Sequence, residues 1–149
     1  MVTTYAGFRF EYGYVKVLAH LPSDAGLWPA LWLAASDLHW PPEIDILEHW
    51  GANMNRTGVY LHPVGLPQLA AHVNMPTISS GWHTFAVLWS PSVVTWYIDG
   101  RQALTTRIGV PHQSMYFIAN LAEASKPRSG WGCEGVMGIR SVQVWQPPH

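Results

Sequence analysis

Apolar residues along the chain occur in short runs that are rich in Val, Ile, Tyr, Phe and Trp and are separated by Gly, Pro, Asn, Asp or Ser. This pattern is typical of β-strands, and no segment shows the long 3.6-residue apolar period of a helix. We therefore predict an all-β chain with strands over residues 8–21, 30–36, 43–49, 57–62, 83–89, 93–99, 101–106, 115–121 and 139–145. Between two of these runs, Asp99-Gly100 predicts a tight two-residue hairpin, because both residue types tolerate a positive φ angle.

The spacing of these strands predicts a β-sandwich or jelly roll, since a single sheet could not bury so much aromatic surface on one side. The prolines lie mainly in the joints between the predicted strands, where they do not interrupt strand pairing. The sequence contains no internal repeat, low-complexity tract or linker. We therefore interpret its 149 residues as one globular domain with its own core.

The composition limits the kinds of molecule that we expect this chain to bind. The formal net charge is -1 and Lys and Arg do not cluster, so we expect no nucleic acid and no anionic membrane as partner. No run approaches the roughly 18 apolar residues of a spanning helix. The chain has nine Trp, more than packing requires, and such flat rings without a basic patch favour stacking on sugars over stacking on bases.

Several familiar motifs are absent or misplaced. GWGCEG, residues 130–135, matches a dinucleotide-binding pattern by its letters, but it does not follow a strand and open a helix. A single cysteine, Cys133, excludes an internal disulfide, and there is no H-E-x-x-H zinc motif and no G-x-S-x-G elbow. The opening residues, MVTTYAGFRFEYGYVKV, lack the order of a secretory signal. We expect no cofactor and no metal-ligand set.

Three acids stand in one short apolar segment, WPPEIDILEHWG, residues 40–51. Side chains alternate along a strand, so Glu43 and Asp45 share one face while the intervening isoleucines point to the other. Glu48 is an odd number of residues from Glu43 and would fall on the core face of a regular strand. We predict that one extra residue bulges around Ile46-Leu47, which brings the three acids onto one face.

Acids placed in this way suit glycoside hydrolysis. On the concave side of a bent sheet Glu43 and Glu48 would lean together, and a retaining mechanism needs carboxyl groups about 5 to 5.5 Å apart. Close acids cannot all ionise cheaply, so one would stay protonated as a general acid. The alternative is a solvated sheet face or a charged edge strand that resists aggregation. Acids are depleted in strands and these lie between Trp40 and Trp50 rather than beside basic partners, which favours the functional interpretation.

Beyond this segment, the whole chain resembles glycoside hydrolase family 16, the concanavalin-like jelly-roll endoglucanases and their relatives. The resemblance rests, in the family's order, on EYGYVKVLAHLP, GLWPALWL, WPPEIDILEHWG, WHTFAVLWSPSVVTWYIDG, MYFIANLA and IRSVQVWQ. Of these segments, WPPEIDILEHWG resembles the family's E-x-D-x-x-E active-site signature. The resemblance implies a concanavalin-like jelly-roll β-sandwich in which a curved sheet forms a substrate cleft.

The resemblance also implies roles for the acids. Glu43 would be the nucleophile that forms the glycosyl-enzyme, and Glu48 would be the acid that protonates the leaving oxygen and then activates water. Asp45 would orient Glu43 and tune the protons on its neighbours. The extra residue before Glu48 is similar to the bulged signature of the laminarinase-like branch. This implies an endo-acting retaining β-glucanase whose partner is a polysaccharide with β-1,3 or mixed β-1,3-1,4 linkages.

Six further residues are implied as sugar contacts by the resemblance: Trp28, Trp32, Trp40, His62, Trp89 and Asn120. Trp131 is a seventh candidate, because of its position in or near a joint. For Trp32 and Trp89 core packing is a strong alternative, because both lie within predicted strands. Trp28, Trp40 and Trp131 lie in or near joints and are better candidates for exposed platforms. His62 could equally be a packed histidine, and Asn120 could cap a turn.

The chain also departs from the family pattern. The family domain normally begins well upstream of EYGYVKV, so we interpret residues 1–149 as a single, N-terminally shortened domain of the family 16 type. We expect exposed sheet edges that allow a homodimer, and the loss of much of the family's structural calcium site. AEASKPRSG, residues 122–130, stands where relatives carry a Gly-rich, Trp-containing loop. A secreted location is expected only from the family.

Two alternatives stay open. The chain could be a non-catalytic glycan-binding protein that keeps the aromatic platforms of the cleft. It could also be a family 16 enzyme acting on another polysaccharide such as a galactan, or a transglycosylase, since relatives use the same acidic strand for these substrates and reactions. Complete retention of Glu43, Asp45 and Glu48 favours an enzyme over a binding protein.

Overall fold

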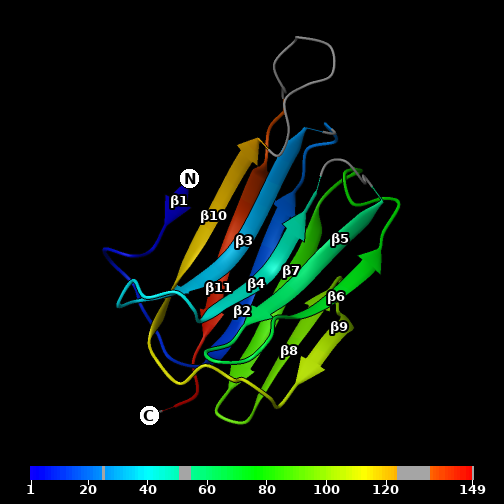
Figure 1. Ribbon diagram of the computed structural model, residues 1–149. Coiled ribbons are helices and arrows are strands. Elements are labelled where there is room, and N and C mark those ends of the chain that lie inside the picture. Colours follow the sequence, from blue (N-terminus) through cyan, green and yellow to red (C-terminus); the bar gives the residue numbers. More distant parts are fainter. Residues whose placement is uncertain (25, 51–54, 124–134, 149) are drawn as a thin grey trace.

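The computed structural model describes residues 1–24, 26–50, 55–123 and 135–148. The all-β prediction is confirmed, because these residues form eleven strands and no helix (Figure 1). The strands are β1 (Val2–Thr3), β2 (Gly13–His20), β3 (Leu27–Ala35), β4 (Glu43–His49), β5 (Arg56–His62), β6 (Leu69–Asn74), β7 (His83–Ser90), β8 (Val93–Ile98), β9 (Arg101–Thr106), β10 (Met115–Glu123) and β11 (Gly138–Trp145). Within these residues no helix has the length and apolar character needed to cross a membrane.

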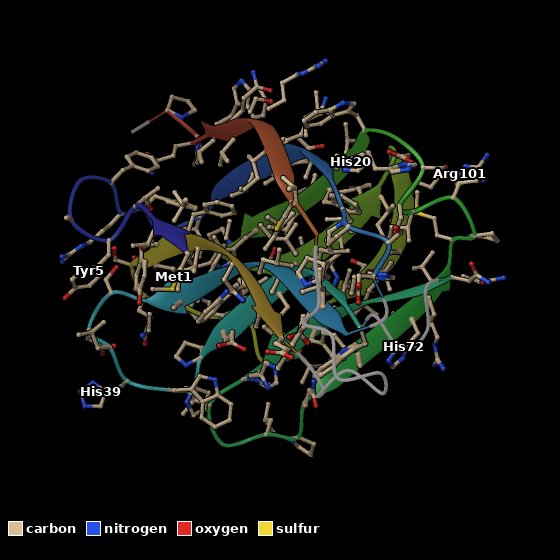
Figure 2. All side chains as sticks on the ribbon, turned by 90° about the horizontal axis from the view of Figure 1, so that it is seen from above. Met1, Tyr5, His20, His39, His72 and Arg101 are labelled. Atoms are coloured by element: carbon tan, nitrogen blue, oxygen red, sulfur yellow. The ribbon has the colours of Figure 1, made fainter. Side chains whose placement is uncertain are left out.

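The strands form two antiparallel sheets. One has six strands in the order β1-β10-β3-β4-β5-β6, and the other has five in the order β11-β2-β7-β8-β9. The sheets stack face to face, and side chains fill the space between them (Figures 1 and 2). Each sheet buries one face in this shared core, which is the sandwich that the strand spacing predicted.

The core follows the alternation of side chains along the strands. On β2, Val15, Val17 and Ala19 are fully buried, and the residues between them are half-buried on the opposite face. The largest buried side chains are Trp89 on β7 and Trp96 on β8. The indole N–H of each donates to a backbone carbonyl, so the polar edge of each ring is satisfied within the core.

Most predicted strands are present, with differences at their ends. The hairpin at Asp99-Gly100 is confirmed, with φ angles of 47° and 74°. β2 begins at Gly13 rather than at Phe8, because Tyr12 has a φ angle of 61° and interrupts the extended chain. The two-residue β1 was not predicted, and neither was β6, whose sequence LAAHVN contains alanines that are depleted in strands.

The predicted bulge in β4 is confirmed. Asp45 and Leu47 pair with consecutive residues of β3, so Ile46 is the extra residue. The pairing with β5 is irregular over the same stretch, between Asp45 and Glu48. Both Ile46 and Leu47 are fully buried. The bulge therefore places the extra residue in the core and returns Glu48 to the face of the strand that carries Glu43 and Asp45.

Candidate active site

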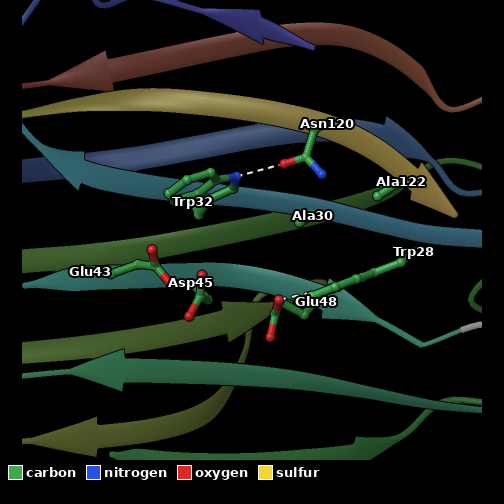
Figure 3. Close-up of a pocket in the computed structure, with 8 residues that line it drawn as sticks. All are labelled: Trp28, Ala30, Trp32, Glu43, Asp45, Glu48, Asn120 and Ala122. Atoms are coloured by element: carbon green, nitrogen blue, oxygen red, sulfur yellow. Dashed lines mark hydrogen bonds between the residues drawn. The ribbon is translucent and has the colours of Figure 1, made fainter. Parts of the chain in front are cut away.

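The three acids of β4 line one cavity on the outer face of the six-stranded sheet. Figure 3 shows Glu43, Asp45 and Glu48 in a row along β4, with β3 next to it and β10 on the far side of β3. The cavity has a volume of about 230 Å³, and its lining residues are Trp28, Ala30, Trp32, Glu43, Asp45, Glu48, Asn120 and Ala122. The prediction that the bulge places the three acids on one face is therefore correct.

Two hydrogen bonds hold the backbone of β4 at the two ends of the bulge. Trp96, from the opposite sheet, donates its indole N–H to the carbonyl of Asp45 at 2.8 Å. Thr57 on β5 donates its hydroxyl to the carbonyl of Glu48, also at 2.8 Å. These bonds satisfy carbonyl groups at the irregular stretch and fix the directions in which the acids project.

Burial makes the three acids difficult to ionise. Only 17% of the Glu43 side chain and 3% of the Asp45 side chain are exposed. Burial, followed by the charge of Asp45, raises the pKa of Glu43 to about 7, and burial raises the pKa of Asp45 to about 6. Burial is also the largest cause that raises the pKa of Glu48. The cavity therefore holds protons at a pH where exposed carboxyls hold none.

His62 is the basic neighbour of two of these acids. It ends β5 and pairs with Glu43 across the strands. Its Nε2 atom lies 3.1 Å from Oδ2 of Asp45 and 3.5 Å from Oε1 of Glu43. The contact with Asp45 raises the pKa of His62, and His62 in turn lowers the pKa of both acids against the larger effect of burial.

Trp28 is the polar neighbour of the third acid. Its indole N–H donates to Oε1 of Glu48 at 3.1 Å, a bond drawn in Figure 3, and this bond lowers the pKa of Glu48 against the effect of burial. The ring of Trp28 stacks on Trp50 with centroids 3.9 Å apart. Trp50 was not predicted as a site residue, although its position two residues after Glu48 was a signal that could have identified it.

Trp32 and Asn120 form the opposite wall of the cavity. The Trp32 indole N–H donates to Oδ1 of Asn120 at 2.7 Å, which links β3 to β10 (Figure 3). Both side chains are half-buried and border the cavity, so the structure places them beside the acids. Two alanines on the same strands, Ala30 and Ala122, complete this wall and leave space above Glu48. Neither alanine was predicted, because nothing in the sequence distinguishes a small apolar residue that lines a cavity from one that does not.

The remaining predicted sugar contacts have different outcomes. Trp40 is 67% exposed. Together with His62 it borders a second hollow and not the cavity that the acids line. Trp89 was predicted as a sugar contact, and this prediction is wrong, because the side chain is 1% exposed and donates to the carbonyl of Pro111 inside the core. Trp131 lies outside the described residues.

Comparison with known proteins identifies the family of this chain. A family model described as glycosyl hydrolases family 16 matches residues 2–133. The chain belongs to glycoside hydrolase family 16. This family 16 chain is 37% identical over 153 residues to the endo-1,3-1,4-beta-glycanase ExsH of Rhizobium meliloti (strain 1021), covering 97% of the chain and 32% of that protein. It is 36% identical over 149 residues to EglC, another endo-1,3-1,4-beta-glycanase of that organism, covering 97% of the chain and 31% of that protein.

Among solved structures, the family 16 chain is similar to the laminarinase from Flavobacterium sp. UMI-01. The TM-score is 0.84 and the identity is 27%, over 97% of this chain and 71% of that structure. This likeness confirms the predicted jelly-roll sandwich. The family 16 chain spans about a third of the length of the curated relatives that it matches.

Proposed function

We propose that this chain is the catalytic region of an endo-acting β-glucanase that hydrolyses internal β-1,3 or mixed β-1,3-1,4 linkages with retention of configuration. The observation that carries the proposal is the row of three acids in one cavity, with Asp45 buried and both glutamates half-buried, brought into phase by the bulge of β4. Membership of family 16 and similarity to proteins named as endo-1,3-1,4-beta-glycanases and a laminarinase support this choice of substrate.

In the proposed reaction Glu43 and Glu48 perform two displacements. Glu43 attacks the anomeric carbon and forms a glycosyl ester, while Glu48 gives its proton to the departing glycosidic oxygen. Glu48 then takes a proton from water, whose oxygen attacks the anomeric carbon and releases Glu43. The acid is regenerated, and one water is consumed for each bond that breaks.

The neighbours of the acids support this division of roles. Glu43 must be ionised when it attacks, and protonated His62 offers a positive charge 3.5 Å from its carboxyl group. Glu48 must hold a proton, and its burial favours the protonated form. Asp45 touches His62 and lies between the two glutamates, where it fixes the His62 ring beside the nucleophile.

The aromatic residues support a polymeric substrate. Trp28 borders the cavity beside Glu48, and Trp40 borders the second hollow beside His62, at the other end of the row of acids. Rings of this kind present flat apolar faces to sugar units while their N–H groups bond elsewhere. A glucan chain that crosses the acids would contact both ends, which suits cleavage at internal linkages.

The test is to incubate the purified protein with laminarin and with mixed-linkage β-glucan and to measure new reducing ends. We expect products from at least one polymer, and a loss of at least about a thousandfold in rate for Glu43→Gln, because the amide cannot form the ester intermediate. Proton NMR of the first products distinguishes retention from inversion of the anomeric configuration. The β-anomer should appear before the α-anomer if configuration is retained.

Other results would overturn the proposal in distinct ways. Early release of the α-anomer would indicate an inverting reaction. A folded wild type that is retained on either glucan but releases no products would support the non-catalytic glycan-binding alternative. Full activity of Glu43→Gln would exclude Glu43 as the nucleophile.

A further inference from the structure

Three side chains at one end of the acid row point their ligand atoms at a common space. Single ligand atoms of Glu43, Asp45 and His62 all lie within 4.8 Å of one another. The distances from His62 Nε2 are 3.1 Å to Asp45 Oδ2 and 3.5 Å to Glu43 Oε1. Two ligand atoms of a tetrahedral zinc ion, each about 2.0–2.2 Å from the metal, are separated by about 3.3 Å. The two distances from His62 therefore match the spacing of ligand atoms around zinc, and the third pair, Glu43 and Asp45, lies within 4.8 Å.

One of these atoms is buried without a hydrogen bond. Oδ2 of Asp45 has no hydrogen-bond partner of acceptable geometry among the described residues, although the side chain is only 3% exposed. His62 Nε2 lies 3.1 Å from this oxygen and pairs with it as an ion when the imidazole is protonated. Buried carboxylate oxygens are normally bonded to a donor or bound to a metal, so this atom indicates a ligand.

The three side chains are held in place before any ligand arrives. Glu43 and Asp45 are two residues apart on β4, and His62 is the cross-strand partner of Glu43 on β5. The His62 ring lies against two aromatic rings, with centroid distances of 5.6 Å to Trp40 and 6.5 Å to Tyr60. A site built on paired strands with a restrained imidazole binds metal at a lower cost in conformational entropy than a loop does.

We propose that Glu43, Asp45 and His62 form a binding site for a divalent transition-metal ion, of which Zn²⁺ is the natural probe, and that the bound ion reversibly blocks glucan hydrolysis. The inhibitory part rests on the proposed function, because it assigns Glu43 as the nucleophile. The binding part does not depend on that assignment.

The set of donor atoms favours this class of metal. Ca²⁺ requires six to eight oxygen ligands and Mg²⁺ prefers octahedral oxygen and water, whereas this site offers one imidazole nitrogen and two carboxylates. Imidazole suits Zn²⁺ and its neighbours in the transition series. Three protein ligands beside an open cavity leave a fourth position for water, as in zinc sites that stay accessible to small molecules.

A metal ion at this site would inhibit glucan hydrolysis in two ways. A metal held by Oε1 of Glu43 takes the electron pair that the nucleophile needs to attack the anomeric carbon. It also occupies the space beside Asp45 and His62, at the border between the acid cavity and the hollow next to Trp40. The ion would therefore compete with the glucan, and a chelator would restore activity, since no covalent bond is made.

The test measures zinc binding directly, by competition with a chromophoric chelator, on wild type, His62→Gln and a control. We expect one tight site in the wild type and a loss of affinity of about tenfold or more in His62→Gln, since a ligand is removed. His39→Gln is the matched control, because Nδ1 of His39 also lies 3.5 Å from a carboxylate oxygen, that of Asp37, but this pair is exposed. Figure 2 shows His39 at the periphery of the molecule. This control should bind zinc as tightly as the wild type.

Two further measurements keep the test decisive. If His62→Gln loses its circular dichroism spectrum, Glu43→Gln takes its place, since it removes one carboxylate ligand and keeps the size of the side chain. Glucan hydrolysis by the wild type should fall over the same zinc concentrations that fill the site, and recover with a chelator. Equal affinity of wild type and His62→Gln, or a loss in His39→Gln alone, would overturn the site.

The two proposals fail separately. A wild type that binds zinc through His62 but releases no reducing ends would leave the metal site standing and overturn the glucanase. A wild type that hydrolyses glucan and binds zinc no more tightly than His62→Gln would leave the glucanase standing and overturn the metal site.

Discussion

The properties of each acid are set by the group that touches it. Glu43 and Asp45 both face His62, whose protonated form favours their ionised forms, while Glu48 accepts a hydrogen bond from the uncharged indole of Trp28. Desolvation raises the pKa values of all three, and the neighbours decide how far each one rises. Carboxyls that share a cavity but have different neighbours can act as nucleophile and acid in one reaction.

The pH dependence of glucan hydrolysis should show the effect of this burial. Activity requires ionised Glu43, so kcat/KM should fall as the pH decreases and Glu43 takes up a proton. Because burial raises the pKa of Glu43 to about 7 and that of Asp45 to about 6, the acid limb should lie between about pH 6 and 7. An exposed glutamate would place it near about 4.3. Initial rates at low substrate, measured from pH 4 to 9, locate this limb.

His62→Gln gives the direction of the electrostatic effect. His62 lowers the pKa of Glu43 and Asp45, so its replacement should move the acid limb to higher pH. The shift should occur together with a lower rate at neutral pH, because less Glu43 is ionised. An acid limb that stays in place, or moves to lower pH, would show that His62 does not act on the protonation of these acids.

At the level of the strands, the pairing of β4 with β5 leaves no space for a larger side chain opposite the bulge. Gly58 on β5 lies opposite Glu48, where the register of the two strands is irregular. The ring of Tyr60 folds over Gly58, and a Cβ atom at this position would overlap the tyrosine hydroxyl and ring atoms. Tyr60 is itself 7% exposed and bonds to His72 on β6, so its ring has little freedom to move aside.

Gly58→Ala should therefore destabilise the protein by about 1–3 kcal/mol, the usual cost of overpacking a filled site. Denaturant unfolding at fixed pH measures the change. Gly7→Ala is the control, because a Cβ atom at Gly7 meets nothing within 4 Å, and it should change stability by less than about 0.5 kcal/mol.

A double mutant separates the clash from other effects of the alanine. Tyr60→Ala removes the ring that the new methyl group would strike, so Gly58→Ala should cost at least about 1 kcal/mol less in that background than in the wild type. If the two substitutions are additive, the loss of stability in Gly58→Ala does not arise from contact with Tyr60.

At the scale of the whole molecule, sequence patterns predicted local features but not which strands pair or in which register. The alternation in β4 and the odd spacing of Glu48 were sufficient to predict the bulge, because side-chain direction is a local property. Trp32 and Trp89 both lie within strands, yet one lines the cavity and the other fills the core. Which face of a strand meets the opposite sheet depends on topology. The contact of His62 with Asp45 likewise depends on the register between two strands.

The stability of the whole fold should depend on pH through its buried acids. A carboxyl whose pKa is higher in the folded than in the unfolded chain stabilises the fold only while protonated. Its contribution is complete below the unfolded value of about 4.3 and is lost as the pH rises through the folded value of about 7. Glu43→Gln cannot ionise and avoids this loss. At pH 8 it should be more stable than the wild type by about 1 kcal/mol, a value reduced for solvent screening.

Denaturant unfolding of both proteins at pH 4 and pH 8 measures this difference, and the pair at pH 4 is the internal control. There the wild-type carboxyl is protonated in the folded chain, so the two free energies of unfolding should be nearly equal. The same substitution should abolish glucan hydrolysis, and activity and stability would then change in opposite directions at one residue. Equal stability at pH 8 would mean that the cavity accommodates ionised Glu43 at no cost, and that burial does not hold protons in this site.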